Sequence, residues 1–412
     1  MAEGDTPVSE PMKIGARVRT VRRRRGLGLE TAAGLAGISK SYLSLLENGK
    51  RQFDRRGLVE DIARALGCSP ADITGQPYLP PDQESAFARS TIEEVEMGLN
   101  DATLTDVPDI RPRPLDELHA LVEVNARQRD TADYRQAGTD LALLLNELHV
   151  HVVTGTGQQR QRAAELLTHA AYNAFVLATT FGYLHLAEQA AQRAHDAANF
   201  AGRPELRAFA MFALGPSVAR VGGRTRGLRM LDKAIADAGS PIIDRDGVTT
   251  GPQMIGLLHL MAAHLRARTA DDDAVVTHLA EAEDIARTVG EGNAFHQHFG
   301  PTNVAVWKVA LGTELGHGPT VAEHAESANV DLTVLQSRDR TAAWHFDLAR
   351  SYGMSEGARD REAVRHLDQA DRLAPQRIRN DPLARDLTLE LNRRAVRPSW
   401  ELTSLRNRFG IR

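Results

Sequence analysis

The sequence has almost none of the residues that build disulfides, and no stretch that suits a membrane. Cys68 is the only cysteine in 412 residues, so no intramolecular disulfide can form, which is typical of proteins in a reducing cytoplasm. No run approaches the roughly 18 apolar residues of a membrane span, and the opening MAEGDTPVSEP is polar and acidic rather than a signal peptide. We therefore expect a cytoplasmic protein with a short disordered leader over residues 1–11.

Groups that carry catalysis, metals or nucleotides are also scarce. The pairs His149 with His151 and His296 with His298 are each separated by one residue, which on a helix points the two rings about 200° apart. No cysteines or carboxylates at metal-binding spacing accompany them. The glycine-bearing stretches TGTGQ and VGGRTRG neither follow a strand nor continue into Gly-Lys-Ser or Gly-Lys-Thr, as a phosphate-binding loop would. We therefore expect no metal, no cofactor and no enzymatic activity.

What the sequence does contain is alanine, leucine and charge. Hydrophobic residues make up 42% and charged residues 25%, the balance of a globular protein, and 412 residues are too many for a single core. From Leu115 onward β-branched runs are rare, and Gly, Pro or Asp interrupts a helical pattern about every fifteen to twenty residues. The chain is therefore expected to be all-α and to hold two or more domains.

The most specific signal lies over residues 29–48, which read LETAAGLAGISKSYLSLLEN. Two short helices that cross steeply need small residues at the crossing and a turn that tolerates positive φ, and Ala33 and Gly37 meet these demands. Ser39 is placed to cap the second helix, which we expect to begin at Lys40. This pattern fits the helix-turn-helix template and predicts sequence-specific binding to duplex DNA.

The second helix of such a motif presents its N-terminal residues to base edges in the major groove. These residues are Ser39, Lys40, Ser41 and Ser44, with Leu45 one position further along the same face. A lysine suits guanine, a serine suits bases or phosphates, and a leucine suits a thymine methyl group. A helical hairpin within some other bundle is the alternative interpretation of this stretch.

The same end of the chain is strongly basic. Residues 12–56 contain twelve Lys or Arg against three Asp or Glu, a net charge of +9, whereas the whole chain carries −4, so the remainder carries −13. A basic module on an acidic body suits a phosphate backbone as the ligand of the module alone. The residues that we predict to contact phosphates are Arg17, Asn48, Lys50, Arg51, Arg55 and Arg56.

These motifs give the chain a family resemblance. Residues 12–75 resemble the five-helix domain of the Cro/C1 and XRE family of bacterial and phage regulators, through the string GISKSYLSLLENGKR and the closing helix ALGCSPADI. The resemblance implies a DNA-contacting second helix, phosphate contacts around its ends and a homodimer on an inverted-repeat operator. Members commonly have Thr-Gln before the first helix of the motif, where this chain has Gly28 and Leu29, so it lacks the glutamine that bonds a phosphate in the family.

Prolines suggest where the domains end. The stretches QPYLPPDQ and VPDIRPRP both stop helices, and between them residues 83–100 are expected to form one helix with Ile92, Val95 and Leu99 on a single stripe. We therefore divide the chain into a helix-turn-helix domain over 12–78, a linker with one helix over 79–113, and a body over 114–412.

The body repeats one spacing of small residues. Alanines at steps of three and four place a narrow, smooth stripe on successive helices. Successive aligned alanines lie 40, 48, 46 and 42 residues apart, and they are Ala194, Ala234, Ala282, Ala328 and Ala370. The body resembles degenerate tetratricopeptide repeats, whose own period is 34 residues, in the manner of the XRE-plus-repeat regulators of actinobacteria. This resemblance implies an α-solenoid of helical hairpins; a rival class of α-solenoid stays open on the repeat length.

A solenoid of this kind has a long concave surface that suits an extended peptide or a partner protein. In peptide receptors that pair a similar head with similar repeats, asparagines on the inner helices hold the peptide backbone, since an amide offers both a donor and an acceptor. The corresponding candidates are the mid-helix asparagines Asn146, Asn173 and Asn303. The alternative for each is a local hydrogen bond or exposure to solvent.

Together these features predict a transcriptional regulator. The body would sense a peptide, a small molecule or a protein on its concave face, and would thereby control the binding of a homodimer to double-stranded DNA. The alternative is a protein-interaction scaffold that carries an auxiliary helix-turn-helix module.

Overall fold

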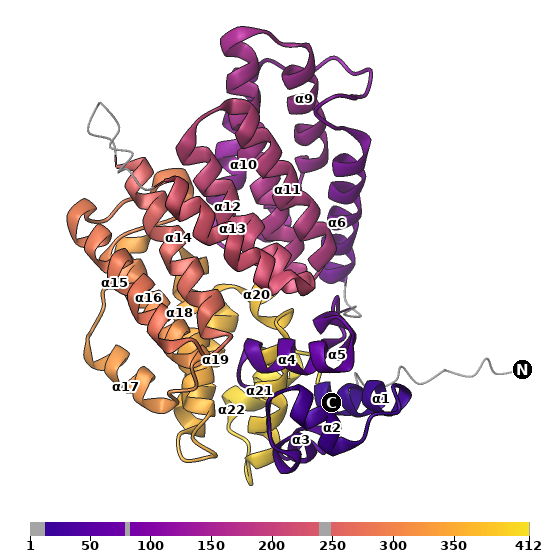
Figure 1. The fold of residues 1–412 in the computed structure, drawn as a ribbon, viewed down its shortest axis with the longest axis vertical. Coiled ribbons are helices and arrows are strands. Elements are labelled where there is room, and N and C mark those ends of the chain that lie inside the picture. Colours follow the sequence, from indigo (N-terminus) through magenta and orange to yellow (C-terminus); the bar gives the residue numbers. More distant parts are fainter. Residues whose placement is uncertain (1–12, 79–82, 239–248, 412) are drawn as a thin grey trace, which may run out of the picture.

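The computed structural model describes residues 13–78, 83–238 and 249–411, which form helices joined by turns and loops, without a β-strand. The leader predicted over residues 1–11 lies outside them. No helix in this described part of the chain is long and apolar enough to span a membrane. Figure 1 shows a small helical head, which holds the N-terminal helices, and a larger helical body stacked on it. The predicted all-α fold is confirmed.

The head consists of five short helices. They are α1 (Ile14–Arg24), α2 (Leu29–Leu35), α3 (Lys40–Glu47), α4 (Arg56–Leu66) and α5 (Pro70–Thr74). Their apolar faces meet in one cluster around Val18, Leu46 and Ile62. The same cluster continues into the body through Trp344 and Tyr352, so the cores of the head and of the body are joined.

The body is an α-solenoid of helix pairs. It opens with α6 (Gln83–Asp101), α7 (Leu115–Asp130), α8 (Tyr134–Gly138) and α9 (Leu141–Thr154). The pairs that follow are α10 (Gly157–Phe181) with α11 (Leu184–Ala201), α12 (Pro204–Val218) with α13 (Arg224–Asp237), α14 (Thr250–Ala267) with α15 (Asp272–Val289), α16 (Pro301–Glu314) with α17 (Pro319–Ser327), α18 (Arg338–Gly353) with α19 (Asp360–Leu373), and α21 (Pro382–Arg394) with α22 (Trp400–Arg408). The short α20 (Pro375–Arg379) precedes the last pair.

The alanine stripe falls on the second helix of successive pairs. Ala194, Ala282 and Ala370 are fully buried in α11, α15 and α19, and Ala234 is partly buried in α13. Ala328 is the exception, because α17 is only nine residues long and ends at Ser327, which leaves Ala328 as an exposed C-cap. The predicted repeat is therefore confirmed in four pairs and wrong in the fifth.

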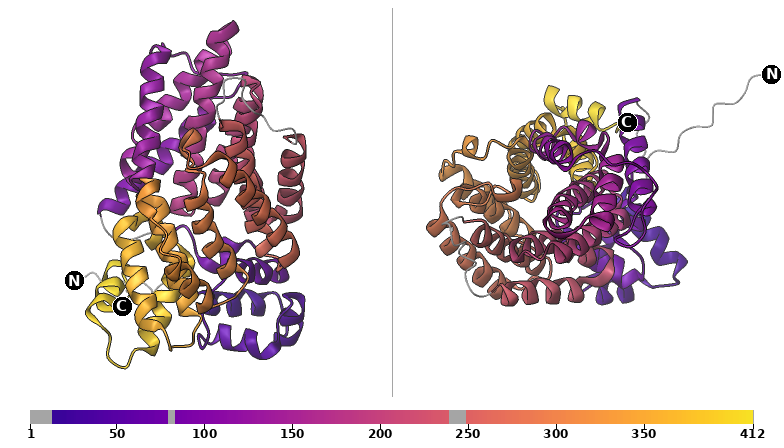
Figure 2. Two further views of the ribbon diagram at one scale, coloured as in Figure 1. Left: turned by 90° about the vertical axis from the view of Figure 1, so that its left-hand side faces the viewer. Right: turned by 90° about the horizontal axis from the view of Figure 1, so that it is seen from above.

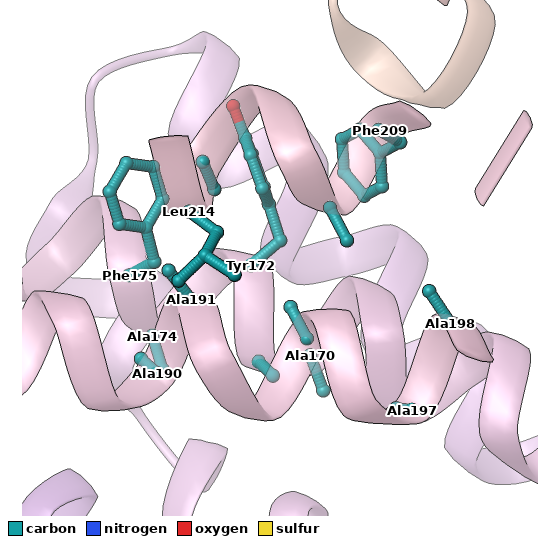
Figure 3. Packing of buried hydrophobic residues seen from close by; sticks show 14 of the residues in the cluster. Ala170, Tyr172, Ala174, Phe175, Ala190, Ala191, Ala197, Ala198, Phe209 and Leu214 are labelled. Atoms are coloured by element: carbon teal, nitrogen blue, oxygen red, sulfur yellow. The ribbon is translucent and has the colours of Figure 1, made fainter. Parts of the chain in front are cut away.

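Small side chains also decide how closely the helices of a pair approach. Figure 3 shows the alanines of α10 and α11 together, with Tyr172, Phe175 and Phe209 filling the space around them. The methyl group of alanine leaves room for the backbone of the neighbouring helix. The aromatic rings fill the space between this pair and the next.

The array curls until its last pairs meet its first helices. Seen from above in Figure 2, the helices of the body run around a common middle. The Tyr134 hydroxyl donates to the Asp339 carboxylate, and the Ser337 hydroxyl donates to the Asp130 carbonyl at 3.5 Å. Residues from the start of the solenoid are thus bonded to residues some 200 positions later, and the array encloses a space in its interior.

The described part of the segment predicted as a linker, residues 83–113, is packed into the body. Its helix, α6, covers the range expected, and Ile92, Val95 and Leu99 are all fully buried against the first helices of the solenoid. Arg193 of α11 adds a hydrogen bond to the Leu99 carbonyl at 3.2 Å. The helix therefore behaves as the first layer of the body and does not hang free between two domains.

The alanine stripe yields a prediction about stability. Ala194→Leu forces a larger side chain into a site with no exposed surface, so we expect the free energy of unfolding to fall by about 1–3 kcal/mol. Ala328→Leu makes the same chemical change at an exposed position and should stay within about 0.5 kcal/mol of the wild type. Urea unfolding followed by circular dichroism measures both. Equal losses in the two variants would contradict the packing role of the stripe.

Candidate nucleic-acid interface

The helix-turn-helix motif has the local geometry that the sequence predicts. The side chain of Ser39 accepts a hydrogen bond from the Tyr42 amide at 3.1 Å, which caps α3 so that the helix begins at Lys40. Gly37 in the turn has φ of 70°, a conformation that glycine adopts without strain. Ala33 at the helix crossing is 1% exposed. These predictions are confirmed.

A buried carboxylate fixes α3 to α1. Arg22 donates from Nε and Nη2 to the two carboxylate oxygens of Glu47, at 2.5 and 2.8 Å, and the Glu47 side chain is almost fully buried. A two-point contact of this kind restrains rotation as well as distance. The last turn of α3 is therefore held firmly while its first turn stays open to solvent.

The residues predicted to read bases lie together on the open side of α3. Ser39, Lys40 and Ser41 are exposed, and Ser44 and Leu45 are partly exposed. In Figure 1, α3 lies at the outer end of the head, away from α10 and α14. The Lys40 ammonium group lies 3.3 Å from a Glu30 carboxylate oxygen, but both side chains are largely solvated, so this ion pair is weak.

Asn48, Lys50 and Arg51 from the predicted phosphate set follow the same helix. Asn48 accepts from Arg19 at 2.5 Å and donates to the Ser44 carbonyl at 2.7 Å, which closes the end of α3. Lys50 is exposed. Arg51 pairs with Glu356 of the body at 2.5 Å across the edge of the head.

The other three members of that set lie elsewhere. Arg17 packs its guanidinium against Gly75 at the end of α5, and Arg55 lies beside Asp54 at 3.4 Å. Arg56 faces the body, where its guanidinium donates to Asp381 at 2.7 Å. A phosphate contact by Arg56 does not fit this arrangement, because body carboxylates already neutralise its charge.

The back of the head is docked on the body by ion pairs. Glu60 of α4 lies between Arg224 and Arg268, with N–O distances of 2.6 and 2.7 Å. Gly57 in the same helix touches the Arg268 carbonyl so closely that a Cβ atom would lie 2.4 Å from its oxygen. At the C-terminal end of α20, the Asn380 carbonyl accepts a hydrogen bond from Gln76 at 2.9 Å. The orientation of the head on the body is thus set at several points.

One acid in this junction, Asp386, has a raised pKa. Asp386 of α21 accepts a hydrogen bond from the Phe53 amide at 2.7 Å. Burial raises the pKa of its carboxyl to about 7; the hydrogen bond from Phe53 and the charge of Lys13 oppose the rise, while Glu390 and Asp54 add to it. Part of the contact between head and body is therefore sensitive to pH near neutrality.

A cavity of about 350 Å³ lies behind this junction, where head and body both supply the wall. The head contributes residues of α4 and α5, including Val59 and Thr74, and the body contributes residues from α7 to α21. The wall combines aromatic and aliphatic side chains with arginines and carboxylates. A molecule in this space would touch the helix-turn-helix domain directly.

The structure brings two of the three candidate asparagines toward this cavity. Asn303 is in its wall, and Asn173 is one hydrogen bond away, because its side-chain oxygen accepts from the lining residue Arg129 at 3.1 Å. Asn146 lies on α9, outside the wall. The sequence analysis missed the lining arginines, because arginine is a good helix former that recurs throughout these helices, so its position alone gives no signal of burial.

His296 and His298 lie differently from the prediction. The stretch around His296 and His298 is not a regular helix, since both residues have positive φ, and the two imidazoles converge on the Asp130 carboxylate at 3.4 and 2.9 Å. The premise that their rings point apart is therefore wrong. Among the residues that the structure describes, no group of three or more His, Cys, Asp or Glu side chains is arranged to hold a metal ion.

The pKa of Asp386 generates a second prediction. Since its folded pKa of about 7 lies above the unfolded value of about 3.9, the carboxyl group stabilises the fold at low pH, and this contribution is lost as the pH rises from about 4 to about 7. Asp386→Asn keeps an acceptor for the Phe53 amide without the charge. We expect it to exceed the wild type in unfolding free energy by about 1 kcal/mol or more at pH 8 and to match it at pH 4.

Urea unfolding at the two pH values measures the difference. Asp237→Asn, which alters an exposed carboxylate on α13, serves as the control and should show no such dependence on pH. A constant difference between Asp386→Asn and the wild type at both pH values would contradict the assignment.

Comparisons with known proteins agree on the head. A family model described as a helix-turn-helix domain matches residues 13–74. Over 62 residues the chain is 37% identical to an uncharacterized HTH-type transcriptional regulator, y4mF, of Sinorhizobium fredii, which is 15% of this chain and 80% of that protein. It is also 37% identical over 62 residues to the competence pilus inhibition repressor of Acinetobacter baylyi, which is 15% of this chain and 56% of that one, so the match spans about half of the repressor.

Among solved structures, the crystal structure of Bacillus thuringiensis PlcR in complex with the peptide PapR7 and DNA aligns with 68% of this chain and 96% of that one, at 11% identity and a TM-score of 0.25. A TM-score this low does not establish a shared arrangement of the body. The assignment rests on the sequence match over the head. The chain belongs to the XRE-type helix-turn-helix transcriptional regulators, which are DNA-binding proteins and not enzymes.

Proposed function

We propose that this protein is a ligand-controlled regulator that binds an inverted-repeat operator as a homodimer, with the ligand in the cavity between head and body. The observation that carries the proposal is the shared wall of that cavity, in which Glu60 of the head and Trp307 of the body face the same space. A ligand that contacts both parts changes the energy of their relative placement, which is what coupling between two sites requires.

How a ligand can act depends on which face of the head the body leaves exposed. The first turn of α3 is exposed while the back of the head is docked, so the ligand has no need to uncover the reading face. In a dimer the angle between head and body sets the separation of the two recognition helices, which must match half-sites about 34 Å apart on B-form DNA. This arrangement therefore supports regulation in which the ligand changes the separation of the two recognition helices, and not regulation in which it covers or uncovers the reading face.

The first test concerns the reading face. Lys40 is exposed at the start of α3, where base edges would lie, so we expect Lys40→Ala to reduce discrimination between operator and random duplex by about 1–3 kcal/mol. Lys50 follows the helix and is equally exposed, so Lys50→Ala should weaken binding to all duplexes alike and lower the slope of log K against log salt by about 1.

Fluorescence anisotropy with a duplex selected from a random pool measures both effects at several salt concentrations. The two lysine variants are matched controls for each other, since each removes one exposed ammonium group. Identical losses on every duplex from both variants would contradict the division between base reading and phosphate contact.

The second test concerns the docking of the head. Glu60→Gln removes the carboxylate that Arg224 and Arg268 share, so we expect the angle of the head to be held less firmly. Binding to a single half-site should stay unchanged, while the preference for one spacing between half-sites should fall by about tenfold, which corresponds to ~1.4 kcal/mol.

Asp237→Asn, which breaks an exposed ion pair with Lys233 far from the head, is the matched control and should retain the spacing preference. Duplexes that differ only in the number of base pairs between half-sites supply the measurement. An unchanged preference in Glu60→Gln would mean that docking does not set the operator geometry.

A further inference from the structure

We propose that the cavity binds an amphipathic organic acid, with its anionic group against Arg220 and Arg340 and its apolar part against Trp307. This inference rests on the proposed function, because it names the chemical class of the ligand for the same cavity. It is carried by the charges of the wall, by the hydrogen-bond donors there that have no acceptor, and by the aromatic and aliphatic side chains beside them.

The wall of the cavity has an excess of positive charge. Seven arginines line it against four carboxylates, Glu60, Asp339, Asp347 and Asp381. Four of the arginines are paired with acids, namely Arg56, Arg268, Arg350 and Arg377. The other three, Arg129, Arg220 and Arg340, have no carboxylate partner among the described residues.

Two of these three arginines are bonded only to neutral groups. Arg129 donates to the side-chain oxygen of Asn173 and to the His296 carbonyl, at 3.1 and 2.9 Å. Arg340 donates twice to the side-chain oxygen of Asn303, at 3.0 and 2.7 Å. The asparagines therefore orient the guanidinium groups without cancelling their charge.

Arg220 has no partner of either kind: it makes no hydrogen bond or ion pair with any described residue, and its side chain lies in the cavity wall. Burial lowers its pKa to about 9; the charges of Arg268 and Arg56 add to the effect, while those of Glu60 and Asp381 oppose it. Burial likewise lowers the pKa of Arg340 to about 10; the charge of Arg377 adds to the effect, while those of Asp339 and Asp347 oppose it. Both guanidinium groups stay charged at neutral pH and lack a direct ion pair among the described residues, so the anionic group of a ligand would be favoured beside either of them.

Neutral donors in the wall point to the same ligand chemistry. The Trp307 indole nitrogen and the Thr179 hydroxyl are buried without a hydrogen-bond partner. Arg268 donates to Nε2 of His264 at 2.8 Å, so the proton of this neutral ring is on Nδ1, which also has no partner. A wall with donors in surplus suits a ligand rich in acceptor oxygens.

The remaining wall is apolar. Phe212 and Trp307 pack edge to face with ring centroids 6.4 Å apart, and Leu257 and Met261 also line the cavity. With about 350 Å³, the cavity has room for one small molecule or for the end of a peptide. The acidic group therefore belongs either to a free organic acid or to the C-terminal carboxylate of a peptide.

Two fluorescent probes with the same ring system test the charge requirement. 8-Anilinonaphthalene-1-sulfonate carries an anionic group, and N-phenyl-1-naphthylamine lacks it. We expect the full-length protein to bind the sulfonate at one saturable site per chain, at least tenfold more tightly than the neutral probe. Arg220→Met and Arg340→Gln should each weaken binding of the sulfonate at least tenfold and leave the neutral probe unaffected.

Arg229→Gln is the matched control, because Arg229 is an exposed arginine on the outer helix α13, and it should bind both probes as the wild type does. Thermal unfolding adds a readout that does not depend on any ligand. Removing a charge with no partner should raise the melting temperature of free Arg220→Met. Equal affinity for the two probes in the wild type, or a lower melting temperature in Arg220→Met, would overturn the assignment.

Competition then identifies the source of the acid. Displacement of the sulfonate by small aromatic and aliphatic carboxylates indicates a free acid, whereas displacement only by heptapeptides with a free C-terminus, and not by their amides, indicates a peptide. Displacement by none of them overturns the inference. Operator affinity is measured in parallel with the sulfonate bound: a filled site that leaves DNA binding unchanged would contradict the proposed function while the anion site stands.

Discussion

The architecture of this protein depends on the ion pairs that join the head to the body. Glu60 is held between Arg224 and Arg268, which come from successive helix pairs, and Arg56 reaches Asp381 on a third. These side chains are largely withdrawn from water, where each charge is stable only beside its partner. The close contact at Gly57 requires the helices to approach backbone to backbone, so the pairs and the packing reinforce one another.

This junction gives the head two different faces. On one side, Lys40 and Lys50 stay exposed around α3, and on the other, Arg56 is neutralised by the body. The basic charge of the head and the acidic charge of the remainder therefore meet only where they are docked. A module that must bind phosphates keeps its free charges on the side that DNA can reach, and uses the others to fix its own orientation.

The curl of the solenoid places the cavity against the back of the head. Because alanines such as Ala194 and Ala282 let the helix pairs pack closely, the array returns on itself, and Tyr134 near its start bonds Asp339 near its end. Charged residues from distant repeats thereby come together in the wall of one cavity. The guanidinium of Arg220 has no direct ion pair there, which is why we propose this cavity as the ligand site.

The sequence alone determined the features that depend on a few neighbouring residues. The cap at Ser39, the turn at Gly37 and the alanine stripes follow from backbone sterics, capping and helical periodicity, all of which act within about one or two turns of a helix. Only the tertiary structure decided which surfaces meet. The docked position of Arg56, the irregular backbone at His296 and the place of Arg220 and Arg340 in the wall of one cavity depend on contacts between repeats far apart in the chain, and no local spacing encodes them.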